Sequence, residues 1–274
     1  MIEKNTFFMR HTDYLDLFFK LIEKFVIPYH QAQITGLERI PDVPLLYIGN
    51  HNGAMLSVDS FIFLSFIHKK FGINSYYPYY MIHNKLLKMP VIGALLEEGG
   101  AIRASHDNAH KLLVEGHKIM AYPGGDLESM RPFSQRNKIK FSGRDGYIRL
   151  ALRENIPIVP VVTAGAHSVY MVIDDMQWLA KLIHSEIWLQ THAWPLTLSI
   201  PWGLTLGPVL YFHYPAKITI EVLEPVYFER VGEKAATDQE WVKECALRIE
   251  TIMQTCLTKI TTDNLINDKN YKCL

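Results

Sequence analysis

Residues 44–59, PLLYIGNHNGAMLSVD, decide the fold of this chain. They begin with a short apolar run, which is typical of a strand that is buried on both faces of a sheet. The predicted strand ends at Gly49 and delivers Asn50 and His51 into a turn. In open α/β sheets, ligands bind beyond the carboxyl ends of the strands, so polar side chains at this point are candidates for chemistry.

Strand and helix patterns alternate along the rest of the chain. This alternation predicts an α/β fold, a single domain with a mostly parallel central sheet flanked by helices. The segments with helical periodicity are 58–70, 109–116, 147–154 and 238–260, and the expected strands are 75–82, 117–121, 158–163 and 217–223.

The N-terminal region predicts one further helix. Apolar residues recur at helical spacing over 14–25, which indicates an amphipathic helix that ends before Pro28 and either packs on the core or touches lipid. We therefore divide the chain into an N-terminal amphipathic helix at 1–34 and a main domain at 35–274. The first residues lack the basic-then-apolar layout of a signal peptide, so secretion is not expected.

The composition argues against several classes of function. Lys plus Arg and Asp plus Glu number 28 each, so no net field attracts a polyanion and nucleic acid is not an expected partner. The 3 cysteines and 12 histidines show no metal-ligand spacing, so no metal site is expected. The odd number of cysteines favours a reduced chain that faces the cytosol.

One segment is unusually apolar. Residues 193–212, AWPLTLSIPWGLTLGPVLYF, carry no charge, yet their prolines and glycines would break a spanning helix. We expect a hairpin or broken helix at a lipid interface, within an apolar membrane-facing segment at 178–214. A buried apolar lid is the alternative, because periodicity does not separate the two. The tryptophans in or just before the segment suit a lipid interface: Trp178, Trp188, Trp194 and Trp202.

His51 and the carboxylate that follows it, Asp59, form a candidate catalytic pair. A neutral imidazole can take the proton from an attacking hydroxyl, and a carboxylate on its other nitrogen fixes the tautomer and stabilises the imidazolium. Such a reaction needs no serine or cysteine nucleophile. A lone pair of this kind is more often two residues that cap a turn and a helix, so the wider pattern has to decide.

A second turn, Tyr122-Pro123-Gly124-Gly125, also follows an apolar run. Glycines let a backbone come close to a ligand, and the N–H groups of such a turn, beside Arg131, are suited to hold a phosphate or a developing oxyanion. An ordinary type II turn has the same Pro-Gly signature.

Together these segments resemble the glycerolipid acyltransferase superfamily, which includes the lysophosphatidic acid (PlsC-like) acyltransferases. The resemblance covers roughly residues 35–225 and rests on the order of four blocks: Asn50-His51 with Asp59, Gly99 to Arg103, Tyr122 to Gly125, and Ile158 to Val162. It implies an acyltransferase-like α/β fold. It also implies catalytic roles for His51 and Asp59 and substrate binding by Asn52, Arg103, Tyr122, Pro123, Gly124, Gly125 and Glu128.

The chain departs from the family pattern at two points. Four residues usually separate the histidine from the aspartate, but Leu56 stands at that position and the carboxylate arrives at Asp59. Asp126 or Glu128 therefore remains an alternative partner for His51. The third block lacks the usual Pro-Glu-Gly and its following arginine, with Leu127 at the arginine position. This variant is similar to the diacylglycerol acyltransferase-like branch and argues against a phosphate-bearing acceptor.

The resemblance implies an O-acyltransferase on the cytoplasmic face of a membrane, peripheral or monotopic. The expected partners are an acyl thioester donor (acyl-CoA or acyl carrier protein), a lipid acceptor with a hydroxyl, and the membrane surface; no cofactor is expected. Two alternatives stay open: a thioesterase that uses the same histidine with water, and a non-catalytic lipid-binding protein. The Gly-x-Ser-x-Gly elbow of α/β hydrolases does not occur in the sequence.

Overall fold

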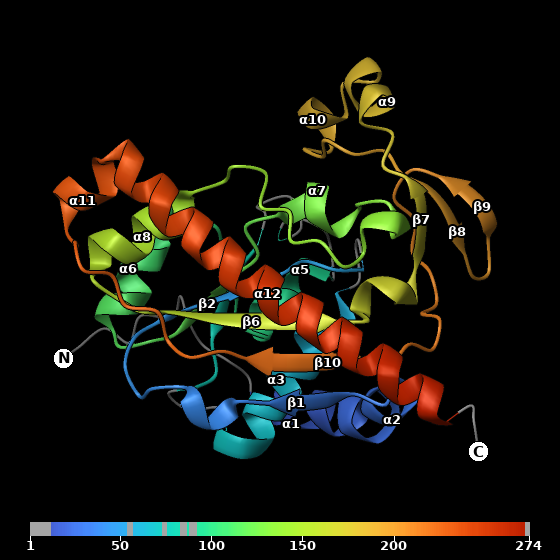
Figure 1. Ribbon diagram of the computed structural model, residues 1–274, viewed down its shortest axis with the longest axis horizontal. Coiled ribbons are helices and arrows are strands. Elements are labelled where there is room, and N and C mark those ends of the chain that lie inside the picture. The colour runs from blue at the N-terminus through green and yellow to red at the C-terminus, as the bar shows by residue number, and fades with distance from the viewer. Residues whose placement is uncertain (1–11, 54–56, 73–75, 83–86, 88–91, 272–274) are drawn as a thin grey trace.

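The computed structural model describes residues 12–53, 57–72, 76–82, 87 and 92–271. A seven-stranded sheet with the order β1-β10-β6-β2-β5-β3-β4 runs through the centre of the molecule (Figure 1). Five neighbouring strands, from β6 to β4, are parallel, and β10 is antiparallel to β6. The strands are β1 (Gln33–Thr35), β2 (Leu46–Gly49), β3 (Tyr79–Ile82), β4 (Ala101–Arg103), β5 (Ile119–Ala121), β6 (Ile158–Ala164) and β10 (Thr219–Val222).

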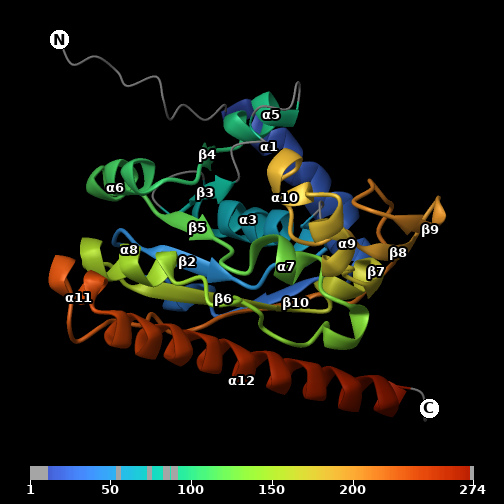
Figure 2. The same ribbon diagram turned by 90° about the horizontal axis from the view of Figure 1, so that it is seen from above.

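Helices cover both faces of this sheet, so the predicted fold class is confirmed (Figure 2). One face packs on α1 and α3, and the other packs on α6, α8, α11 and α12. The helices of the main domain are α3 (Val58–Phe71), α5 (Ile92–Glu98), α6 (His106–Val114), α7 (Gly125–Ser129), α8 (Gly146–Glu154), α11 (Glu233–Thr237) and α12 (Gln239–Tyr271). The short 3-10 helices are η3 (Leu37–Arg39), η4 (Phe133–Gln135) and η5 (Ala166–Val169).

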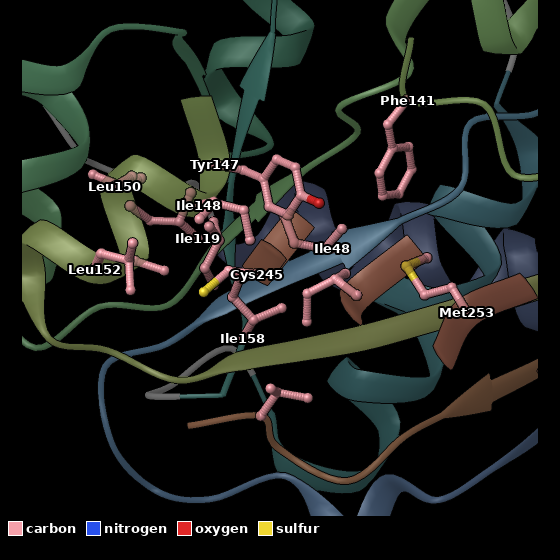
Figure 3. Close-up of a cluster of buried hydrophobic side chains, with 14 of the residues drawn as sticks. Ile48, Ile119, Phe141, Tyr147, Ile148, Leu150, Leu152, Ile158, Cys245 and Met253 are labelled. Atoms are coloured by element: carbon pink, nitrogen blue, oxygen red, sulfur yellow. The ribbon is translucent and has the colours of Figure 1, made fainter. Parts of the chain in front are cut away.

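Alternation along the central strand β2 divides the core in two. Tyr47 faces the core on the α1 and α3 side, whereas Leu46 and Ile48 face the core on the α8 and α12 side. Figure 3 shows this second core, in which Ile48 lies among side chains from β5, β6, α8 and α12. Since every residue of β2 and β6 is buried, both strands need the continuous apolar sequence by which they were predicted.

The N-terminal region is helical, and it continues further than expected. Helix α1 (Thr12–Leu21) leads through a π-helical turn, η2 (Ile22–Val26), into α2 (Ile27–Tyr29). The expected end before Pro28 is therefore wrong. Pro28 lies in the first turn of α2, where a backbone N–H has no helical partner and a proline is tolerated.

The apolar segment forms a second, antiparallel sheet with the order β7-β8-β9. Strands β8 and β9 pair as a β-hairpin with Leu196 opposite Leu206, one of the two forms expected for residues 193–212. No described helix is long and apolar enough to cross a membrane. The elements of this layer are β7 (Met171–Asp174), α9 (Gln177–Leu182), α10 (Ser185–Trp188), β8 (Leu196–Ser199) and β9 (Gly203–Leu206).

Candidate functional site

The predicted site residues cluster where β2 and β5 end. These two strands are parallel neighbours, so His51 after β2 and Tyr122 after β5 emerge at the same edge of the sheet. The two rings lie with their centroids 5.0 Å apart. Figure 2 shows α7, which follows the Tyr122 turn, beyond the arrowhead of β2.

Asn50 and Gly49 set the path of the chain into the site. The Asn50 side chain donates to the Thr163 carbonyl at 2.9 Å and accepts from the Thr163 N–H at 2.8 Å, so it extends the pairing of β2 with β6. A Cβ atom at Gly49 would lie 2.5 Å from the Tyr122 ring. Glycine at this position therefore lets Tyr122 pack beside the strand end and reach His51.

His51 is half-buried, and its backbone is held on both sides. Its N–H donates to Glu128 Oε2 at 2.9 Å, and its carbonyl accepts from Arg131 Nη1 at 2.8 Å. Loss of solvent and the nearby Arg131 charge lower the pKa of the His51 imidazole to about 4. The ring is therefore neutral at physiological pH, which is the form that accepts a proton.

Asp59 is buried in the first turn of α3 and is joined to His51 through Ser57. The Ser57 hydroxyl donates to Asp59 Oδ1 at 2.9 Å and lies 3.5 Å from His51 Nδ1. Asn52 Nδ2 donates to the other carboxylate oxygen at 2.8 Å. Burial raises the pKa of Asp59, and the hydrogen bonds from Asn52 and Ser57 act in the opposite direction.

The two alternative carboxylates are engaged elsewhere. Asp126 binds Arg144 at 2.8 Å and the His192 ring at 3.1 Å. Glu128 accepts the backbone N–H groups of His51 and Lys140, and neither carboxylate hydrogen-bonds to the His51 ring. Among the described residues, only Asp59 is joined to that ring through a hydrogen-bonded neighbour.

Arg131 is fully buried beneath the site and uses all five of its N–H donors. They reach the carbonyls of His51, Glu128, Gln135 and Arg136 and the side-chain oxygen of Asn52, at 2.6–3.0 Å. Because these bonds use every N–H group, the guanidinium itself is not available to a phosphate, and the expected anion site at the N–H groups of the Tyr122 turn stays a prediction. The position of Arg131 instead ties the His51 loop to the segment after α7.

The Tyr122 to Gly125 turn is held from the side by Arg144. Arg144 Nη1 donates to the Gly124 carbonyl at 2.9 Å, and a Cβ atom at Gly125 would lie 2.2 Å from that nitrogen. Gly125 also has a φ of +52°, in the left-handed region. Pro123 forms the turn with them, and its carbonyl lies 3.5 Å from Arg144.

The structure does not bring every predicted site residue to His51. Asn52 is buried and oriented by Arg131, so it supports the carboxylate from inside. Arg103 ends the edge strand β4, three strands from β2, or about 14 Å across the sheet. Its side chain is exposed and makes no ion pair with a described residue. The site thus consists of His51, Asp59 and the Tyr122 turn, with Arg103 at its outer end.

Sequence reasoning missed Ser57 and Arg144 at the site. Ser57 is the first hydroxyl after Leu56, so the missing aspartate was a signal that another polar group serves His51. Arg144 lies in a stretch that the family resemblance included without assigning it a role. No periodicity reveals either contact, because each joins loops that meet only in the folded chain.

Comparison with known proteins finds a matching family model and a similar fold. The family model named Acyltransferase matches residues 31–164, which include β2, β5 and the Tyr122 turn. In the solved 1-acyl-sn-glycerophosphate (LPA) acyltransferase PlsC from Thermotoga maritima, the fold is similar, with a TM-score of 0.57 and 16% identity. That match covers 90% of this chain and 79% of the other.

Two groups of curated relatives share 27% sequence identity with this chain. An uncharacterized protein of Mycobacterium tuberculosis is 27% identical over 237 residues, which cover 86% of this chain and 63% of the relative. Human diacylglycerol O-acyltransferase 2 is 27% identical over 162 residues, which cover 55% of this chain and 40% of the relative. The matched regions thus span less than two thirds of these relatives' own lengths.

Proposed function

We propose that this chain, whose residues 31–164 match the Acyltransferase family model, moves a fatty acyl group from a thioester to a lipid hydroxyl in the manner of the glycerolipid acyltransferases. The observation that carries the proposal is a neutral imidazole, His51, at the carboxyl end of β2 within the matched region. The acyl donor is acyl-CoA or an acyl carrier protein.

His51 acts as the general base in this reaction. Its Nε2 takes the proton of the acceptor hydroxyl as that oxygen bonds to the thioester carbonyl carbon. The carbon–sulfur bond then breaks, and the leaving thiolate takes the proton from the imidazolium, so the histidine is restored. A positioned base of this kind contributes about 10²–10⁴-fold, and no covalent enzyme intermediate forms.

The turn and the edge arginine are assigned to substrate binding. The Tyr122 to Gly125 turn follows β5, the strand next to β2, so it lies at the same edge of the sheet as His51. N–H groups of this turn can stabilise the oxyanion that develops on the thioester carbonyl. Arg103 is an exposed cation at the same edge of the sheet, so a phosphate of the donor or the acceptor is its proposed ligand.

A neutral acceptor such as diacylglycerol fits this site better than a lysophosphatidate. Leu127 occupies the position of a family arginine, and the nearby Arg131 has no N–H group left for a phosphate. The similarity to human diacylglycerol O-acyltransferase 2 supports the same class of acceptor.

The second sheet supports a membrane-facing position for the site. Its pattern of burial is inverted relative to a water-facing sheet: Thr197 and Ser199 are buried, whereas their neighbour Leu198 is 40% exposed. Fourteen large apolar side chains are exposed between residues 171 and 212, far more than single scattered residues. They are Met171, Ile173, Trp178, Leu182, Ile187, Trp188, Leu189, Leu198, Ile200, Trp202, Leu204, Leu206, Leu210 and Phe212. We call this surface the apolar layer.

The N-terminal helices extend the apolar layer. Leu17, Leu21, Phe25 and Tyr29 recur every four residues and are 48–61% exposed, so they form a stripe along the outside of α1 to α2. The stripe meets the layer where the Tyr29 hydroxyl donates to the His213 carbonyl at 2.8 Å. Two segments far apart in the sequence thus support one proposed lipid-contacting surface beside the site, on a peripheral or monotopic protein.

Thiol release from long-chain acyl-CoA, in the presence of vesicles, tests this function. We expect release only when the vesicles contain an acceptor, with diacylglycerol more effective than lysophosphatidate and a new acylated lipid among the products. Release without an acceptor would identify a thioesterase. If the full chain releases no thiol from acyl-CoA or from acyl carrier protein with any acceptor, the acyl transfer proposal is wrong and lipid binding alone remains.

A further inference from the structure

The family pattern has a carboxylate at position 56, whereas the carboxylate of this chain stands at position 59. The Ser57 side chain lies between that carboxylate and the His51 ring. Position 56 is leucine in this chain, and Asp59 lies in the first turn of α3 rather than in the loop. No direct hydrogen bond joins its carboxylate to the imidazole within the described part of the chain. The Ser57 hydroxyl lies between them, 3.5 Å from His51 Nδ1 and 2.9 Å from Asp59 Oδ1.

The direction of the hydrogen bonds follows from what each group can donate. The Asp59 carboxylate accepts from Ser57 on one oxygen and from Asn52 on the other. Because Ser57 donates its only proton to Asp59, its oxygen is left to accept from His51 Nδ1–H. The imidazole then carries its proton on Nδ1 and has its lone pair on Nε2.

We propose that Ser57 is a positioning residue that bridges His51 to Asp59 and so replaces the aspartate missing at position 56. The bridge fixes the Nδ1–H tautomer, keeps the Nε2 lone pair ready for the acceptor hydroxyl, and connects the imidazolium to a carboxylate. Asp59 takes up no proton in this step, because the only proton that moves is the one that His51 passes from the acceptor to the leaving thiolate. The catalytic role of the bridge rests on the proposed function, whereas the tautomer does not.

A second set of hydroxyls holds Ser57 in place. The Ser60 hydroxyl lies 2.9 Å from Ser57 Oγ and 2.6 Å from the Tyr122 hydroxyl, so α3 and the turn after β5 are joined on the far side of the bridge. Burial raises the pKa of Tyr122 well above its usual value, so its phenol remains protonated and adds no charge near Asp59. Neutral hydroxyls from α3 and from the turn after β5 therefore lie beside the bridge.

The first test measures which of the two imidazole nitrogens of His51 carries the proton in the full-length protein. With ¹⁵N-labelled histidine, we expect His51 of the wild type to show a protonated Nδ1 and an unprotonated Nε2. In Ser57→Ala the bridge is lost, and the ring should shift toward the Nε2–H tautomer that histidine favours in water. Ser57→Thr keeps a hydroxyl and should restore the Nδ1–H tautomer.

Kinetics provide the second readout. We expect Ser57→Ala to lower kcat by about 10–100-fold with little change in KM, the size of effect usual for a residue that orients a catalytic group. The double variant Ser57→Ala/Asp59→Asn should be no slower than Asp59→Asn, since both act through one bridge. Ser65→Ala is the matched control, because Ser65 is a buried α3 serine whose hydroxyl has no hydrogen-bond partner among the described residues.

Either of two results would overturn the bridge. One is an Nε2–H tautomer in the wild type, and the other is an unchanged tautomer and an unchanged kcat in Ser57→Ala. Melting temperatures identify a variant that fails to fold, and Ser57→Thr then decides. Because the tautomer is measured without substrate, a wild type that shows Nδ1–H but transfers no acyl group would refute the proposed function and leave the bridge standing.

Discussion

At the scale of single residues, burial sets the chemistry of the site. Loss of solvent keeps His51 neutral, and it also lowers the pKa of His167, a buried histidine below the site, to about 3. Burial raises the pKa of Glu128 to about 7, against the opposing effect of the Arg131 guanidinium. The sequence predicts His51 and Asp59 but not these shifts, because they depend on loops that meet only after folding.

The lowered pKa of His51 predicts the pH dependence of activity. The neutral ring is the active form, so protonation abolishes catalysis, and a lower pKa moves that loss to a lower pH. We expect kcat/KM to stay nearly constant from about pH 8 to about pH 5.5 and to fall toward an apparent pKa near 4, rather than near the usual histidine value of about 6.5. A titration near 6.5 in the pH profile would show that the ring is more exposed to water than the structure indicates.

Arg131 predicts a stability effect without a direct catalytic contact. Arg131→Met removes the charge but leaves Glu128 and the Asn52 oxygen buried without their partner, which should cost roughly 3–5 kcal/mol of unfolding free energy. Urea unfolding measures the loss. Arg103→Met is the control, since an exposed arginine without an ion pair should change stability by less than about 0.5 kcal/mol. Equal effects of the two substitutions would contradict the assigned role of Arg131.

At the scale of elements, the second sheet is attached to both catalytic loops. The buried Tyr211 hydroxyl donates to the Gly53 carbonyl in the loop after His51. The His192 ring binds Asp126 beside the Tyr122 turn at 3.1 Å. The prolines, glycines and apolar residues of the segment predicted either a hairpin or a broken helix, but these two attachments carry no local signal.

The Tyr211 contact predicts a coupling between the second sheet and the His51 loop. Tyr211→Phe removes one hydrogen bond and keeps the ring stacked on Tyr170, at a cost of about 1 kcal/mol. If that energy holds the loop in its active geometry, kcat should fall about fivefold while vesicle binding stays unchanged. An unchanged kcat would mean that the loop keeps its geometry without this contact.

The proposed lipid contact of the apolar layer can be tested at the β8–β9 hairpin. Leu204→Ser/Leu206→Ser removes two exposed leucines from β9 and should weaken partition to vesicles by about tenfold or more. The matched control Val114→Ser/Leu247→Ser alters two equally exposed apolar side chains on α6 and α12 and should leave partition unchanged. Equal behaviour of both variants would exclude the apolar layer as the lipid-contacting surface.

At the scale of the whole molecule, the sequence predicted the inner strands of the central sheet better than the short strands at its two edges. The strands β2, β5 and β6 were predicted from apolar runs that are buried on the sheet, and β10 was predicted from the alternation of residues 217–223. The short strands β1 and β4 were missed, since their three residues, QIT and AIR, each include a polar or charged side chain and form no apolar run. The predicted end of the N-terminal helix came too early. The helix passes through Pro28 after a π-helical turn, and such a turn leaves no pattern in the residues.

The arrangement of layers places the candidate site and the second sheet toward the same side of the molecule. The carboxyl ends of the parallel strands, the Tyr122 turn and the second sheet lie toward one side, whereas α12 covers the opposite face of the central sheet from α1 and α3 (Figures 1 and 2). A lipid acceptor that enters from the apolar layer would therefore reach His51 without crossing the protein core. This orientation is the reason to assay every variant on vesicles rather than on dispersed substrate.

The central claim is that His51 accepts the proton of a lipid hydroxyl. The most direct test measures the formation of acylated lipid from acyl-CoA and diacylglycerol vesicles by the wild type, His51→Ala and His110→Ala, an exposed histidine on α6. We predict that His51→Ala lowers kcat by about 10²–10⁴-fold at unchanged vesicle binding and that His110→Ala matches the wild type. Acyl transfer by His51→Ala at the wild-type rate would contradict the account.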